Sequence, residues 1–211
     1  MRKSQKLMIT SIMVAVIAMV TVGPTMSWLS ATTDPVVNTF AGGAIALQLD
    51  ESQVDANGKK MADAPRVKEN RYKYMAGAEM DKDPTVTVLK GSEECYVFLL
   101  VEKELNEKFS INYDIDSWLK VAEADSKTIY AYKETVDAYK SEKDMELPPI
   151  FTQIDISSDL SETDITELGE RKLSVTAFAV QASNMDANTA CSLAAEQFGM
   201  AQASVSVPDI Q

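Results

Sequence analysis

The chain has 211 residues, of which 45% are hydrophobic and 25% are charged, the composition of an ordinary globular protein. Its formal net charge of −12 at pH 7 makes nucleic acids and anionic lipid headgroups unfavourable partners, because like charges repel. The absence of histidine excludes Ser-His-Asp and Cys-His catalysis, HExxH zinc proteases and most zinc sites.

Residues 1–27 have the pattern of a secretory signal peptide. A basic start is followed by an uncharged apolar run over residues 7–23, which Pro24 ends. The small residues that follow predict cleavage after Ser27, with Ala31 as the alternative. The rival interpretation is an uncleaved membrane anchor, because the run is near the shortest length that spans a bilayer. We therefore expect residues 28–211 to be secreted as a single domain. The protein would contact a membrane only where its leader remains uncleaved.

Residues 82–102 predict the centre of a β-sheet. Two runs of strand-forming residues, 85–89 and 95–102, flank a polar turn at 90–94, which is typical of paired strands. The second run is apolar on both faces until Glu102, so we expect this strand to be buried between two layers.

The rest of the chain predicts further short strands and one late helix. Residues 173–181 are again apolar on both faces and should form a second central strand. The acidic residues 158–170 predict a loop, and Asp186 or Asn188 is the candidate N-cap of a helix over 189–198. The remaining predicted strands are 44–49, 72–75, 111–114, 118–121, 128–135 and 151–157. Because no regular helices separate the strands, the pattern predicts a mainly β protein, an antiparallel β-sandwich of jelly-roll or immunoglobulin-like type.

Acidic residues cluster at several points that could hold a cation or supply a catalytic pair. Each cluster lies at a turn between predicted strands, where solvated carboxylates are expected without any further role. The sequence therefore predicts a protein that is not an enzyme and that has no catalytic, cofactor-binding or metal-binding residues. The clusters are Asp81/Asp83, Glu93/Glu94, Asp114/Asp116, and Asp155/Asp159 with Glu162/Asp164.

Tyrosines and cysteines are the other candidate functional residues. Cys95 and Cys191 could form one disulfide in an oxidising compartment, but the apolar strand around Cys95 favours a buried core residue. Aromatic side chains could line a carbohydrate-binding face, although about half of them are expected in the core. These residues are Tyr72, Tyr74, Tyr130, Tyr132 and Tyr139.

Several motifs together resemble the TasA/camelysin-like family, secreted proteins of Gram-positive bacteria that carry the SipW-dependent type of signal peptide. Each motif is loose by itself, and the resemblance rests on their order along the chain. The matching positions are Asn38, Thr39, Phe40, Gly43, Ile45 and Leu47, then residues 82–86 and 96–98, and finally 177–181 and 188–195. The chain departs from the pattern at Ser30, where many relatives have an aromatic residue.

The resemblance implies a jelly-roll sandwich that a dedicated signal peptidase exports and trims. It also implies assembly into biofilm-matrix fibres by donor-strand exchange, in which the N-terminal segment (residues 28–40) of one subunit completes the sheet of the next. The inserting residues would be Trp28, Leu29, Val36, Val37 and Phe40. The alternative is that this segment is the first strand of its own domain.

The function expected from the resemblance is a secreted structural protein of the cell surface or biofilm matrix, whose main partner is itself. The alternative is a monomeric extracellular module that binds a glycan or a protein. The metalloprotease activity described for camelysins is not carried over, because the chain has no histidine.

Overall fold

The computed structural model describes residues 30–32, 45–201, 203–204, 206 and 210. In this part of the chain the helices are α2 (Ala138–Ser141), α3 (Glu162–Leu168) and α4 (Ala187–Gln197). The strands are β1 (Ser30–Thr32), β2 (Leu47–Ser52), β3 (Arg66–Val67), β4 (Glu79–Asp81), β5 (Thr85–Val88), β6 (Cys95–Lys103), β7 (Phe109–Ile111), β8 (Trp118–Ala124), β9 (Lys127–Tyr132), β10 (Met145–Glu146), β11 (Gln153–Ile156) and β12 (Leu173–Gln181).

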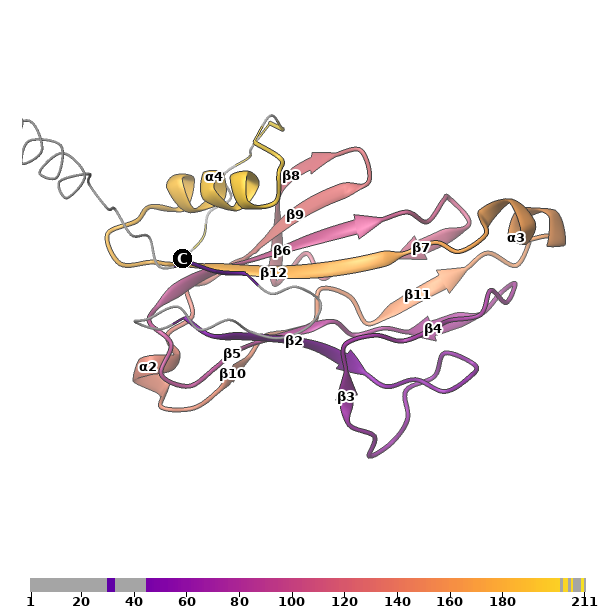
Figure 1. Cartoon of the computed structure of the whole chain (residues 1–211), viewed down its shortest axis with the longest axis horizontal. Helices are drawn as coiled ribbons and strands as arrows, with labels where there is room; N and C mark the ends of the chain where they lie inside the picture. The colour runs from indigo at the N-terminus through magenta and orange to yellow at the C-terminus, as the bar shows by residue number, and fades with distance from the viewer. Residues whose placement is uncertain (1–29, 33–44, 202, 205, 207–209, 211) are drawn as a thin grey trace, which may run out of the picture.

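The described part of the protein is mainly β, as predicted, with three antiparallel sheets and few helices (Figure 1). The five-stranded sheet has the order β1-β12-β6-β9-β8, and the four-stranded sheet has the order β10-β5-β2-β3. The third sheet has the order β4-β11-β7. None of the described helices is long and apolar enough to cross a membrane. The predicted leader, residues 1–27, lies outside the described residues.

Strand β6 is the middle strand of the five-stranded sheet, as its two apolar faces predict. Val97 and Leu99 face one buried cluster, whereas Phe98 and Leu100 face another on the opposite side of the sheet. Strand β12 pairs with β6 along its whole length and lies between β6 and β1. The prediction that both strands are central is confirmed.

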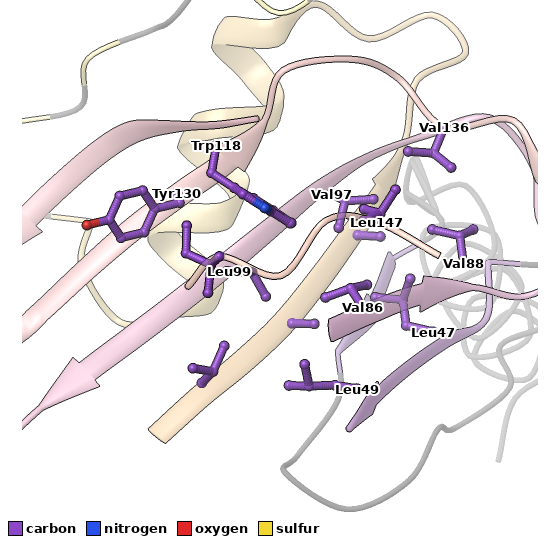
Figure 2. Close-up of a cluster of buried hydrophobic side chains, with 14 of the residues drawn as sticks. Leu47, Leu49, Val86, Val88, Val97, Leu99, Trp118, Tyr130, Val136 and Leu147 are labelled. Atoms are coloured by element: carbon purple, nitrogen blue, oxygen red, sulfur yellow. The ribbon is translucent and has the colours of Figure 1, made fainter. Parts of the chain in front are cut away.

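The five-stranded sheet packs on the four-stranded sheet through a cluster of buried side chains (Figure 2). Leu47 and Val86 from the four-stranded sheet meet Val97, Leu99 and Trp118 from the five-stranded sheet. Each such side chain contributes about 1.5–3 kcal/mol when it is fully buried, so this cluster holds the two sheets together.

Helix α4 covers the other face of the five-stranded sheet (Figure 1). Its N-cap is Asp186, whose carboxylate accepts a hydrogen bond from the Thr189 N–H at 2.7 Å. The small residues Ala190 and Ala194 are completely buried and let the helix approach Phe98. The predicted late helix is therefore confirmed, and it begins two residues earlier than predicted, at Ala187.

The two runs within residues 82–102 are strands, but the prediction that they pair with each other is wrong. Strand β5 pairs with β2 and β10, whereas β6 pairs with β9 and β12. The connection between them crosses from one sheet to the other. Ser92 anchors this connection, because its buried Oγ accepts a hydrogen bond from the Ala46 N–H at 3.0 Å.

Three further sequence predictions need correction. The strand predicted at 111–114 is β7, Phe109–Ile111, so only Ile111 of the predicted range lies in a strand. Residues 158–170 contain α3 instead of a loop, because the Ser161 Oγ accepts from the Asp164 N–H while the Asp164 carboxylate accepts from the Ser161 N–H. This reciprocal capping box stabilises the start of the helix although the segment is acidic. At the other end of the helix, the Leu168 side chain is buried. Residues 72–75 form no strand, and Tyr72 instead donates a hydrogen bond from its hydroxyl to the Asp81 carbonyl at 2.9 Å.

Candidate functional site at the outer edge of β12

Strand β1 occupies part of the outer edge of β12. The two strands are antiparallel, with Ser30 opposite Val180, Ala31 opposite Ala179 and Thr32 opposite Phe178. This pairing covers three residues, whereas β12 pairs with β6 over all nine of its residues. Within the described residues, β1 therefore occupies the outer edge of β12 at Phe178, Ala179 and Val180.

Backbone hydrogen bonds show which residues of β12 present their N–H and C=O groups to this edge. The Ala182 N–H donates to the Glu94 carbonyl at 2.8 Å, and the Lys172 carbonyl accepts from the Glu104 N–H at 3.0 Å, so both residues bond toward β6. The direction of the backbone N–H and C=O groups alternates from one residue to the next along a strand. The backbone groups of Leu173, Val175 and Ala179 therefore point away from β6, toward the outer edge. Ala31 opposite Ala179 is therefore a hydrogen-bonded pair.

A cleft of about 670 Å³ opens beside the first part of β12. Leu173, Ser174 and Val175 form one side of it, Leu49 of β2 forms another, and the three-stranded sheet contributes Phe109 and Ile154. The cleft thus lies where the three sheets meet, next to the part of β12 that β1 does not cover.

A buried ion pair forms one wall of the cleft. The Lys82 Nζ donates to the Glu51 Oε2, and the Asn70 Nδ2 donates to the Glu51 Oε1 at 2.9 Å. The Lys82 Nζ also lies 5.9 Å from the centre of the Tyr72 ring. Burial, reinforced by the nearby carboxylates of Glu51, Asp83 and Asp81, raises the pKa of Tyr72 far above its ordinary value, so the phenol stays neutral.

A second polar network fixes the start of β3 beside the cleft. The Asp83 carboxylate accepts hydrogen bonds from the Ser52 N–H at 2.6 Å and from the Ser52 Oγ at 2.7 Å. Arg66 forms ion pairs with Asp50 and Asp83 and donates to the backbone carbonyls of both. These bonds join β2, β3 and the segment before β5, so the network is structural.

Asp83→Asn should destabilise the protein more at neutral pH than in acid. Burial would raise the pKa of Asp83, but the Ser52 hydrogen bonds and the Arg66 and Lys60 charges outweigh burial and lower it. A depressed carboxyl pKa stabilises the fold above the unfolded value of about 3.9, and this contribution is lost as pH falls through the folded pKa. We expect a loss of about 1–3 kcal/mol at pH 7 and a smaller loss at pH 3, measured by urea unfolding.

Asp116→Asn is the matched control for this measurement, because Asp116 is exposed in a turn. It should change the free energy of unfolding by less than about 0.5 kcal/mol at both pH values. A loss for Asp83→Asn that stays constant from pH 7 to pH 3 would contradict the role assigned to the carboxylate.

The predicted inserting residues lie outside the described part of the chain. This applies to Trp28, Leu29, Val36, Val37 and Phe40. The structure does describe Ser30–Thr32, which lies within the N-terminal segment, and places it on β12 as β1. The role of the five predicted residues in insertion therefore stays a prediction.

Several carboxylates of the predicted acidic clusters hold turns and caps in place. Asp81 accepts from the Lys60 N–H at 2.8 Å, and Asp114 accepts from the Asp116 and Ser117 N–H groups at 3.1 Å each. Asp159 forms an ion pair with Lys108 at 2.8 Å. Among the described residues, no group of three or more Asp, Glu, Cys or His side chains could hold a metal ion.

The five tyrosines do not share one face. Tyr72 and Tyr74 line the cleft, whereas Tyr130 is buried and stacks on Tyr113 with ring centres 5.3 Å apart. Tyr132 packs against Trp118, and Tyr139 is exposed on α2. The structure therefore does not support a common carbohydrate-binding face formed by all five.

Cys95 and Cys191 are both free and buried. They lie in different clusters, on opposite faces of the five-stranded sheet. Burial raises the pKa of Cys95 to about 12 and that of Cys191 to about 11. Both thiols are thus protonated at neutral pH and behave as core residues.

Sequence reasoning missed the buried Glu51–Lys82 pair and the cleft beside it. A signal for the pair was present, because Glu51 continues the alternation in which Leu47 and Leu49 point inward. An inward carboxylate requires a partner. Lys82 lies 31 residues further along the chain, and no local pattern connects the two.

Comparisons of the chain with protein-family models, with curated proteins and with solved structures found no match. The features of the molecule that bear on its function are therefore the edge of β12 and the adjoining cleft.

Proposed function

We propose that this protein is a secreted, non-enzymatic structural protein of the cell surface or biofilm matrix. A signal peptidase removes its leader, and residues 28–211 form a sandwich of jelly-roll or immunoglobulin-like type. Subunits polymerise by donor-strand exchange: the N-terminal segment of one subunit replaces β1 on the β12 edge of the next. The observation that carries the proposal is the pairing of Ser30–Thr32 with the outer edge of β12.

The position of β1 suits exchange between subunits. A terminal strand at a sheet edge can leave its own domain and occupy the same edge of an identical copy. Residues 33–44 connect β1 to the rest of the protein, and a chain of that length reaches about 40 Å when extended. Each subunit then offers one strand and one edge, so head-to-tail pairing does not close and gives fibres.

The backbone bonds alone do not drive this exchange. Each described β1–β12 pair that is broken within a subunit is formed again between subunits. Association also costs at least about 4 kcal/mol in lost translational and rotational freedom. The gain must therefore come from apolar side chains of the N-terminal segment, and full burial of one such side chain contributes about 1.5–3 kcal/mol.

A mixed cross-linking experiment tests the exchange. One protein carries Ser30→Cys and the other carries Val180→Cys, both starting at Trp28. These positions form a non-hydrogen-bonded pair, for which the Cα atoms are about 4.5 Å apart and a disulfide fits. We expect oxidation of the mixture to give a covalent heterodimer, because neither protein alone contains both new thiols.

Two controls make the result decisive. The unsubstituted protein should not cross-link, because Cys95 and Cys191 are completely buried. Ala31→Pro removes an N–H that donates to β12, so it should abolish both the cross-link and any filaments seen by negative-stain microscopy, whereas Ala31→Val should keep both. A heterodimer that never forms, with a protein that stays monomeric by light scattering, would overturn the proposal.

A further inference from the structure

The edge of β12 continues beyond β1 as an open strand. Leu173 and Val175 point their backbone N–H and C=O groups outward, and among the described residues these groups have no hydrogen-bond partner. Both residues line the cleft. An unpaired edge next to a cavity is a template for an additional strand, because main-chain groups of an extended chain can pair with it.

The N-terminal segment does not fit this part of the edge in the register that β1 sets. Ser30 is opposite Val180, and counting onward places Pro35 opposite Val175. Proline has no N–H to donate to the Val175 carbonyl. A strand that continued β1 in this register, within the chain or between subunits, could not donate to this carbonyl.

The inner wall of the cleft is apolar. The side chains of Leu173 and Val175 face it from β12, and Leu49, Phe109 and Ile154 complete it. An added strand would point every second side chain toward this wall. The occupant should therefore carry apolar residues at alternate positions.

The outer side of the cleft is basic, although the whole chain has a net charge of −12. Of the four acidic lining residues, Asp50 is paired with Arg66, Glu51 with Lys82 and Glu69 with Arg71. Glu170 forms no ion pair among the described residues, so three unpaired basic residues face one unpaired carboxylate. Lys68, Arg171 and Lys172 form no ion pair among the described residues, and we call these three the basic rim.

We propose that the cleft binds an extended acidic peptide of a partner protein as an additional strand on β12. Its backbone pairs with Leu173 and Val175, its apolar side chains enter the cleft, and its carboxylates meet the basic rim. An acidic polysaccharide would satisfy the basic rim but would leave the regular N–H and C=O pattern of the edge unused. This proposal does not depend on donor-strand exchange, which uses the other end of β12.

A blocked peptide of about eight residues that alternates valine and glutamate is the direct probe. We expect it to bind the mature protein in a fluorescence-anisotropy titration, and a peptide that alternates valine and lysine to bind at least about tenfold more weakly. Amide hydrogen exchange should slow at Leu173 and Val175 when the acidic peptide is bound, because their N–H groups become hydrogen-bonded.

Charge reversal tests the basic rim. The double variant Arg171→Glu with Lys172→Glu should weaken binding of the acidic peptide about tenfold at low salt, and by less at high salt. Lys143→Glu is the matched control, because Lys143 is exposed and does not line the cleft. It should leave binding unchanged.

Three outcomes would overturn the proposal. A peptide with N-methylated backbone amides that binds as well as the parent would exclude strand pairing. Equal binding by the rim variant would exclude the electrostatic role. A sulfated polysaccharide that binds while the acidic peptide does not would assign the cleft to a glycan. Filament formation and peptide binding are measured separately. A protein that forms no filaments therefore does not contradict the peptide-binding proposal, and a protein that binds no peptide does not contradict donor-strand exchange.

Discussion

Lys82→Met should lower the free energy of unfolding by about 3–5 kcal/mol, because it leaves the Glu51 carboxylate buried without its ion-pair partner. The Glu51 side chain is only 5% exposed and that of Lys82 is 12% exposed, so water cannot replace the lost partner. Methionine keeps most of the length of the lysine side chain, which limits the cavity. Urea unfolding followed by circular dichroism measures the loss.

Two further variants separate the buried charge from ordinary packing. Replacing both partners, with Glu51→Leu added to Lys82→Met, should recover most of the stability, because no unpaired charge remains. Lys120→Met breaks the exposed pair with Glu123, whose side chains are 58% and 59% exposed, and should cost less than about 1 kcal/mol. If Lys82→Met costs no more than Lys120→Met, the Glu51–Lys82 pair does not hold this wall of the cleft.

The sequence predicts the central strands well because their environment is uniform. Strands β6 and β12 are buried on both faces, so every residue carries the same apolar signal. The same signal does not identify which strands pair, so it does not distinguish a β5–β6 hairpin from the observed pairing of β5 with β2 and β10 and of β6 with β9 and β12. Their true arrangement depends on contacts such as that of Ser92 with Ala46, which lies 46 residues away in the chain.

The candidate site was predictable only in part. The sequence predicts that the N-terminal segment is either a strand donated to the next subunit or the first strand of its own domain. The structure places Ser30–Thr32 on β12 of the same chain, and nothing local in the sequence identifies β12 as the strand it pairs with. The cleft was not foreseen, because its wall joins Leu49, Phe109 and Leu173, which are far apart in the chain and belong to three sheets. Basic residues in loops appear as ordinary solvated charges until the fold brings them to one rim.

Phe178→Ala should also destabilise the protein by about 3–5 kcal/mol, because it opens a cavity under α4. Phe178 is 2% exposed, and its ring centre lies 6.2 Å from that of Phe98 and 6.0 Å from that of Phe198. Phe178→Leu should cost less, about 1–2 kcal/mol, and Tyr139→Ala on the exposed face of α2 should cost less than about 0.5 kcal/mol. Urea unfolding of the three variants under the same conditions gives the comparison.

The Phe178→Ala substitution also distinguishes an effect on the stability of the fold from an effect on the proposed strand exchange. Its side chain packs under α4, whereas the β12 groups that bond to β1 lie in the plane of the sheet. Under conditions where Phe178→Ala remains folded, any filaments seen by negative-stain microscopy should therefore form as they do without the substitution. Filaments that fail to form from the folded variant would show that the α4 layer positions the edge of β12.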